Sequence, residues 1–223
     1  MCILKWSVNM DKQLQPHEFV AIKEQVIILN KAFNSVNDKN VKSVVQADVI
    51  ETVKAILPDT DVANEFLAQL PEIALSKQRA EHAFKQLAEL VTPFPELSAN
   101  QLGKLFKKVK KLPEPKWENM NRHEMTYLGW NDNGSQKKYI VAPRDGKLVG
   151  IYGDFDPKPL NGLCAICHQL GTVSMFLSKV KSRGAEGNYT KRGNFICRDS
   201  SLCNAQLSSL DYLASFVETT LVK

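Results

Sequence analysis

The amino-acid sequence predicts an α+β protein in which a helical bundle precedes an α/β domain organised around four cysteines. Two changes of pattern along the chain support this division. In the first half, apolar residues recur at three- and four-residue steps, which is typical of amphipathic helices. After Trp117 the runs become short, aromatic and β-branched, which is typical of strands. Prolines interrupt the helical pattern twice within Thr92–Pro95, so we expect domains at residues 1–92 and 96–223.

Two long helices are expected at the start of the chain. Pro16 is typical of a first helical turn, and Asp38 is suited to cap the next helix. The valines of the second segment favour a strand by propensity, but their spacing favours a helix, and we follow the spacing. Pro58 is expected to end this helix. The expected buried stripes are Phe19, Ile22, Val26, Leu29, Phe33 and Val36, followed by Val41, Val45, Val49, Val53 and Ile56.

Three shorter helices are expected next. Asp59 or Asp61 can cap one that Pro71 closes, and Ser76 can cap another. Ser98 can cap a third, whose lysines are expected to cover the side opposite its apolar face. The apolar positions of the three are Val62, Phe66 and Leu70; Ala80, Phe84, Leu87 and Val91; and Leu102, Leu105, Phe106 and Val109. These stripes indicate helix packing rather than a cofactor site.

Strands and turns alternate in the second half. The expected strands are 126–130, 138–142, 147–152, 173–177 and 195–196, with turn sequences at 131–134 and 144–146 that predict hairpins. A last helix is expected to bury Leu207, Leu210, Leu213, Val217 and Leu221.

Four of the five cysteines lie in two close pairs, Cys164-x-x-Cys167 and Cys197-x5-Cys203. Two such pairs can supply the four thiolates of a tetrahedral structural zinc site. A disulfide framework requires an oxidising compartment, and a redox pair at the first two cysteines leaves the second pair unexplained. His168 is either a replacement for one sulfur ligand or a solvated loop residue. A knuckle, a hairpin and a helix that share one zinc ion form a treble clef, and we expect this small unit to depend on the metal for its fold.

The net charge of +5 is unevenly distributed. Residues 98–116 contain six lysines and one glutamate, and residues 161–203 contain six basic and two acidic residues. Such patches indicate an acidic protein partner or RNA, or else solvated faces. Pro113 and Pro115, within the first patch, form the alternative domain boundary.

No apolar run approaches the roughly twenty residues of a membrane span. Residues 1–9 are too short for a secretory leader, and Met10 is an alternative start, so Cys2 carries little weight. We therefore expect a cytoplasmic monomer without a membrane segment.

Several stretches resemble the elongation factor G-binding, fusidic acid resistance family of the FusB/FusC type. The most specific are Gly162-Leu-Cys-Ala-Ile-Cys167 and Phe195-Ile-Cys-Arg-Asp-Ser-Ser-Leu-Cys-Asn-Ala-Gln-Leu207. Others are Phe106-Lys-Lys-Val-Lys-Lys-Leu112, Gly129-Trp-Asn131, Lys138-Tyr-Ile140, Gly150-Ile-Tyr-Gly153 and Val173-Ser-Met-Phe-Leu177, with Ser35-Val-Asn-Asp38 in the first half. The resemblance extends over nearly all of the chain from about residue 15.

This resemblance implies a helical N-terminal domain, a treble-clef zinc domain and binding to elongation factor G. It further implies release of the factor from ribosomes on which fusidic acid has trapped it, with the ribosome as an indirect partner. The family's zinc ligands match Cys164, Cys167, Cys197 and Cys203. Its contact surface for the factor matches Leu163, Arg192, Phe195 and Phe216, to which we add Lys191.

The chain departs from the family at part of this surface. Resistance members often carry an aromatic residue at the position of Leu163, a lysine at that of Arg192 and a tyrosine at that of Phe195. Arg192 retains the charge, whereas Phe195 lacks the hydroxyl. For Leu163 and Phe216, core packing is the alternative to partner contact.

The sequence leaves two other classes of protein as alternatives. A zinc-stabilised protein that binds RNA or the ribosome without a resistance role would place the same lysines on phosphates. A zinc hydrolase or deaminase requires an open coordination position, which four cysteines would close, and no His-x-Glu motif accompanies the cysteine pairs. We therefore expect a binding protein rather than an enzyme.

Overall fold

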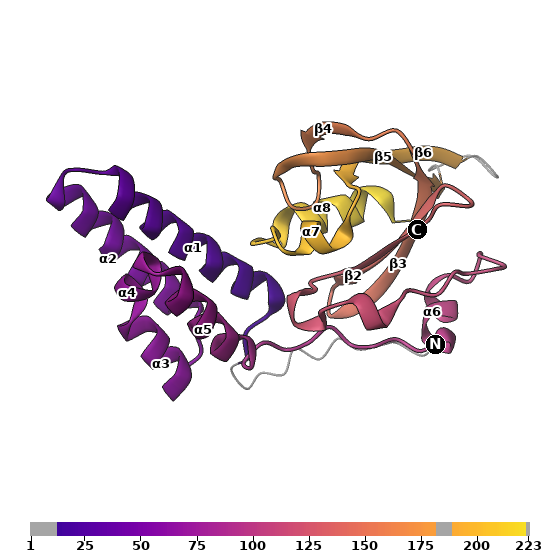
Figure 1. Ribbon diagram of the computed structural model, residues 1–223. Coiled ribbons are helices and arrows are strands. Elements are labelled where there is room, and N and C mark those ends of the chain that lie inside the picture. The colour runs from indigo at the N-terminus through magenta and orange to yellow at the C-terminus, as the bar shows by residue number, and fades with distance from the viewer. Residues whose placement is uncertain (1–12, 182–188, 222–223) are drawn as a thin grey trace. The chain divides into compact units, whose positions relative to one another are not determined.

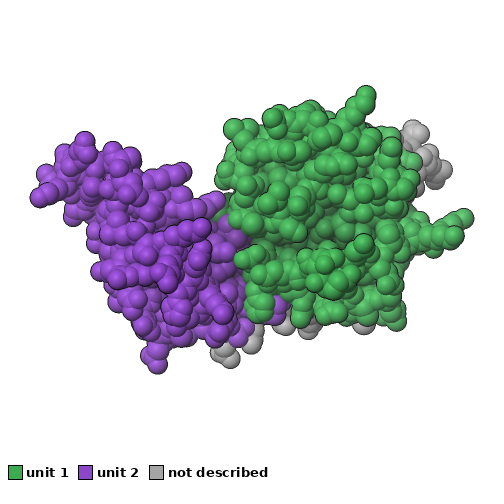
Figure 2. Space-filling view, in the orientation of Figure 1, with its two compact units in different colours: residues 1–8, 94–223 green, residues 9–93 purple. Residues whose placement is uncertain are grey.

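The computed structural model describes residues 13–181 and 189–221 (Figure 1). The chain separates into two compact units between Pro93 and Phe94, a helical unit and a sheet-containing unit (Figure 2). This order of a helical region followed by an antiparallel sheet confirms the predicted fold class. The expectations concerning residues 1–9, Met10 and two charged residues of the second basic patch, Arg183 and Glu186, lie outside the described residues.

The helical unit packs its apolar stripes into one core. Its helices are α1 (Pro16–Ser35), α2 (Lys39–Ile56), α3 (Asp61–Ala68), α4 (Leu70–Leu75) and α5 (Lys77–Ala88). The most deeply buried side chains include Ile22, Leu29, Val53, Leu70 and Leu87. Leu14 and Val91 form a parallel bridge that joins the two ends of this unit. Leucine and other apolar residues from all five helices therefore stabilise it.

Local signals predicted most, though not all, of the helix ends. Asp38 accepts hydrogen bonds from the backbone N–H groups of Asn40 and Val41, as expected of a cap. The predicted cap of α3 is wrong, because the hydroxyl of Thr60 accepts from Ala63 instead. Pro71 does not close a helix either: it lies in the first turn of α4, where a missing N–H is tolerated.

The predicted valine stripe of α2 is buried only in its second half. Val49 and Val53 are buried, whereas the side chain of Val41 is 45% exposed. A periodic stripe shows which side of a helix is apolar, but not how far its neighbours extend along it.

The second unit contains a six-stranded antiparallel sheet. Its strands are β1 (Leu128–Asp132), β2 (Lys137–Arg144), β3 (Lys147–Phe155), β4 (Leu160–Leu163), β5 (Leu170–Lys181) and β6 (Tyr189–Cys197). Hydrogen-bonded neighbours follow the path β1-β2-β3-β5-β4. Strand β6 is off this path and also pairs with β5. The helical segments are α6 (Ala99–Leu105), η1 (Trp117–Asn119), η2 (Arg122–Glu124), α7 (Ser200–Asn204) and α8 (Asp211–Thr220). Asp145 and Gly146 both have positive φ in the β2–β3 turn, as a two-residue hairpin requires.

Three predictions for this unit are corrected by the structure. The helix capped by Ser98 ends at Leu105, so Lys107 and the lysines after it are not on a helix. The run expected to form one last helix is divided: Leu207 is buried in the segment between α7 and α8. Strand β4, directly before the first cysteine, was not predicted.

Both faces of the sheet are covered. Along β2, Ile140 and Ala142 belong to the core around the cysteines, whereas Tyr139 and Val141 belong to a core with Phe106 of the segment after α6. This alternation is the period of a strand, and a strand covered on both faces places apolar residues on each of them. In the described part of the chain, no helix has both the length and the apolar composition needed to cross a bilayer.

Candidate metal centre and partner surface

The four cysteines of the C-terminal unit meet at one point. Cys164 and Cys167 lie in the turn after β4, Cys197 ends β6, and Cys203 lies on α7. Their sulfur atoms all lie within 4.8 Å of one another. The Sγ atoms of Cys164 and Cys203 are 3.8 Å apart, and those of Cys167 and Cys197 are 3.7 Å apart. Zinc–sulfur bonds of about 2.3 Å in a tetrahedron separate the sulfurs by about 3.8 Å, so the cluster fits a structural zinc ion.

Backbone groups support the charge that thiolate ligands carry. The N–H groups of Ile166 and Cys197 both donate to the Sγ of Cys164, each at 3.3 Å. Hydrogen bonds from the other cysteine thiols, that of Cys167 first, hold the pKa of Cys164 far below its ordinary value. Such bonds orient a metal ligand and stabilise its ionised form. With four sulfur ligands the coordination shell is complete, so the metal would stabilise the fold and leave no open position for chemistry.

His168 shapes the turn and is not part of the described cysteine cluster. Its φ of 56° is in the left-handed region, and its N–H donates to the carbonyl oxygen of Cys164 at 3.0 Å. Its exposed ring stacks on that of Tyr212 of α8, with centroids 4.0 Å apart. The structure therefore favours an exposed loop histidine over a replacement ligand.

Asn204 positions the helix of the fourth cysteine, a role that the sequence did not indicate. Its side chain is 3% exposed. Its Oδ1 accepts from the N–H groups of Thr126 and Tyr127, and its Nδ2 donates to the carbonyl oxygens of Tyr127 and Ser200. Three of these hydrogen bonds join α7 to the segment that enters β1, and the bond to Ser200 lies within α7. Only its place beside Cys203 marked this residue in the sequence.

Lys138 is a second residue that the sequence did not mark as important. It lies on the same side of β2 as Ile140, which faces the cysteine core, and its side chain is fully buried. Its Nζ donates to Oδ1 of Asn131 and to the carbonyl oxygen of Arg198. Burial lowers the pKa of this lysine to about 8. Lys138 thereby ties β2 to the segment that follows Cys197.

Two of the residues expected to contact a partner, Leu163 and Phe216, line a cavity of about 360 Å³ beside the metal centre. Leu163 is 47% exposed and Phe216 only 4%, because Phe216 packs against Phe176 of β5. Tyr212 and His168 line the same cavity. Leu163 is thus available to a partner, whereas Phe216 supports the cavity from beneath.

The other three expected contact residues lie on β6 and do not share one face. Lys191 and Phe195 are separated by an even number of positions and project to one side of the strand, whereas Arg192 projects to the other. Asn194, on the same side as Arg192, lines the cavity that contains Leu163. Arg192 thus projects to the side of β6 that carries Asn194, whereas Lys191 and Phe195 project to the other side. Lys191 instead forms an ion pair with Asp154 at 3.0 Å.

A helical unit followed by a knuckle, a hairpin and a short helix around four cysteines defines the class of treble-clef zinc-finger proteins. Two family models agree with this description. Residues 13–95 match the model for the N-terminal part of elongation factor G-binding protein, and residues 104–215 match the FBP C-terminal treble-clef zinc finger. The chain belongs to this elongation factor G-binding family, which confirms the resemblance and the predicted structural zinc.

Comparison with solved structures gives the same result at the level of the whole chain. The structure of the fusidic acid resistance protein FusC matches with a TM-score of 0.87 and 35% sequence identity. The match covers 95% of this chain and 99% of FusC. A comparison with curated protein sequences found no match.

Proposed function

We propose that this protein binds elongation factor G through its zinc-finger unit and promotes the factor's release from ribosomes stalled by fusidic acid. The observation that carries the proposal is the similarity to the fusidic acid resistance protein FusC over almost the full length of both chains. The two family models, which carry the elongation factor G-binding description, support it. Resistance would then arise from protection of the target.

The cavity beside the metal centre is the contact surface we propose. Leu163 supplies an exposed apolar side chain, Phe216 lines the cavity, and Arg192 carries a positive charge two positions from Asn194, another lining residue. An apolar contact flanked by a cation is suited to a partner surface that is apolar at its centre and acidic at its rim. Zinc contributes by fixing the turn after β4, which presents Leu163, directly beside the first cysteine.

Release requires a difference in affinity between two states of the factor. A protein that binds both states of the factor equally shifts no equilibrium, so it must prefer the state with weakened ribosome contacts. Each tenfold gain in release needs about 1.4 kcal/mol of such preference. Basic side chains near the contact would speed the encounter more than they strengthen the complex.

The test is the dissociation rate of fluorescently labelled elongation factor G from ribosomes stalled by fusidic acid, with and without this protein. We expect the wild-type chain to accelerate dissociation and the Leu163→Asp variant to have lost this effect. Leu160→Asp is the matched control, because Leu160 also lies on β4 and is 44% exposed, but is not among the residues that line the cavity. An unchanged dissociation rate with the wild-type chain would refute the release mechanism.

A further inference from the structure

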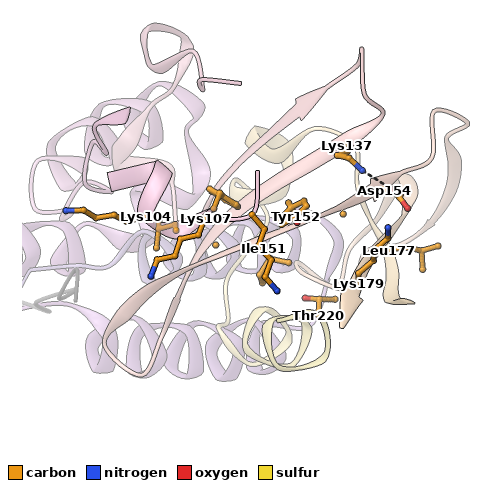
Figure 3. Close-up of a pocket in the computed structure, with 14 residues that line it drawn as sticks. Lys104, Lys107, Lys137, Ile151, Tyr152, Asp154, Leu177, Lys179 and Thr220 are labelled. Atoms are coloured by element: carbon orange, nitrogen blue, oxygen red, sulfur yellow. Dashed lines mark hydrogen bonds and ion pairs between the residues drawn. The ribbon is translucent and has the colours of Figure 1, made fainter. Parts of the chain in front are cut away.

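A second, larger hollow lies in the C-terminal unit away from the metal centre. Its volume is about 680 Å³, within the range of sites that hold a ligand or a short peptide. Its floor is apolar and includes Ile151, Tyr152 and Leu177 (Figure 3). Its rim carries lysines from segments that are far apart in the sequence: Lys104, Lys107, Lys108, Lys137 and Lys179. We call this hollow the lysine groove.

The lysine groove has a surplus of positive charge. Its lining contains one carboxylate, Asp154, which receives hydrogen bonds from Lys137 at 2.8 Å and Lys191 at 3.0 Å. The Lys137 bond, followed by the Lys191 bond, lowers the pKa of Asp154, so this group is ionised and already compensated. The remaining four lysines of the rim are exposed and have no ion pair within the described part of the chain. Their charge is available to a ligand.

The lysine groove is elongated along β3. Lys104 and Lys107 lie toward one end, Lys137 and Lys179 lie toward the other, and Ile151 and Tyr152 lie between them (Figure 3). The part of β3 from Gly150 to Asp154 spans about 13 Å, the length of four or five extended residues. At Gly150 a Cβ atom would approach the carbonyl oxygen of Leu105 to 2.9 Å, so glycine permits the end of α6 to pack closely on the strand. The wall of the groove is thus part of the fold.

We infer that the lysine groove binds an extended acidic segment of elongation factor G, with an apolar side chain of that segment on the floor. This inference rests on the proposed function and adds a second contact to it. The lysines at both ends would pair with carboxylates, and the apolar floor between them would bury one apolar side chain.

The composition of the lysine groove favours a protein segment over RNA. Single-stranded RNA is held by aromatic rings with open faces and by arginine. The two rings that line the groove are Phe106, which is buried, and Tyr152, which contacts Phe106 edge to face with centroids 6.3 Å apart and stacks on Tyr139. No arginine is among the described lining residues. An acidic peptide with an apolar anchor needs neither feature.

Two double variants with equal charge changes provide the test. Lys107→Glu/Lys108→Glu reverses two lysines of the groove, whereas Lys110→Glu/Lys111→Glu reverses two exposed lysines that follow closely in the chain and are not among its lining residues. Titration of elongation factor G at low salt should show binding about tenfold weaker for the first variant. The second should bind within about twofold of wild type. Equal effects, or none, would overturn the inference.

The same titrations separate this inference from the proposed function. If the wild-type chain and Lys107→Glu/Lys108→Glu bind the factor equally well, the lysine groove is not a contact and the proposed function stands. If the wild-type chain does not bind at all, both fail.

A photo-crosslinking residue at Lys179 identifies the occupant. We expect crosslinks to one segment of elongation factor G that is rich in Asp and Glu. A labelled single-stranded RNA oligonucleotide should bind the wild-type chain no better than it binds Lys107→Glu/Lys108→Glu. RNA binding that is lost only in that variant would instead assign the groove to RNA and overturn the inference, as would crosslinks to a segment without acidic residues.

Discussion

The helical unit and the zinc-finger unit stabilise their interiors by different means. In the helical unit, five helices bury a continuous apolar core, and side chains such as Asp38 and Ser76 cap the helix ends. In the zinc-finger unit, the segments nearest the cysteines are short, because β4 has four residues and α7 has five. Such segments bury too little apolar surface to be fixed by packing alone, so ligand bonds and buried polar contacts must position them.

This difference has a consequence for function. The exposed Leu163 and the turn beside it belong to the part of the molecule that the metal organises. Loss of zinc should therefore affect partner binding directly, whereas a lesion in the helical core should not.

Exchange of Cys203 for serine should be the most damaging change. It removes one of four thiolates, and zinc binding contributes on the order of 10 kcal/mol to the folding of small zinc domains. We expect a metal assay to find no zinc in the purified variant. The midpoint temperature of the calorimetric transition of residues 94–223 should fall. The transition of residues 9–93 should persist. His168→Ala is the control, because His168 lies beside the cysteines without belonging to their cluster, and it should retain zinc. A Cys203→Ser chain with one zinc per molecule would refute the ligand assignment.

Leu29→Ala tests the helical core in the same way. Leu29 of α1 is fully buried, and truncation of a buried leucine costs about 3 kcal/mol. Denaturation by urea should show this loss in the helical unit while the zinc content remains that of wild type. Ile28→Ala, at an exposed position of the same helix, should change stability by less than about 0.5 kcal/mol. Equal effects of the two variants would contradict the burial described for α1.

Asn204→Ala should destabilise the zinc-finger unit by about 2 kcal/mol. It leaves the buried N–H groups of Thr126 and Tyr127 without their acceptor. The measurement is urea denaturation of the zinc-loaded chain. Asn161→Ala, at an exposed position of β4, is the comparison and should be nearly neutral. If both variants have the same midpoint urea concentration as the wild type, Asn204 has no positioning role.

Asp38→Ala should have the smallest effect, a loss of about 1 kcal/mol confined to the helical unit. Asp38 accepts two backbone N–H groups at the start of α2, and alanine cannot replace this cap. The loss should be measurable when helix unfolding is followed by circular dichroism. Asn37→Ala, at the exposed neighbouring position, should leave the stability of the helical unit unchanged. A neutral result would show that solvent satisfies this helix end equally well.

The features that the sequence predicted correctly depend on few neighbouring residues. A cap such as Asp38 or Ser98 acts on N–H groups two or three positions away, and the cysteine spacing restricts the metal to one coordination type. The fold class followed from periodicity for the same reason. The α2 stripe was correct as a helix, but the exposure of Val41 depends on how far other helices extend.

The features that the sequence did not predict depend on convergence in three dimensions. The hydrogen-bonding role of Asn204 cannot be inferred from its local pattern, because its partners outside α7 lie 77 and 78 positions away. The lysines after Leu105 were assigned to a helix face, whereas α6 ends there and the lysines of the groove come from three separate segments. Partner residues transferred by resemblance carried no information on which side of β6 they face, and the strand's alternation separates Arg192 from Phe195.

The most direct test of the account is a titration of elongation factor G with the zinc-loaded chain and with Cys203→Ser. We predict a saturable complex with the zinc-loaded chain and loss of this complex in the variant, while Asn161→Ala, an exposed position that does not line the cavity, binds as the wild type does. A Cys203→Ser chain that lacks zinc and still binds elongation factor G with unchanged affinity would contradict the claim that the metal-organised surface is the site of recognition.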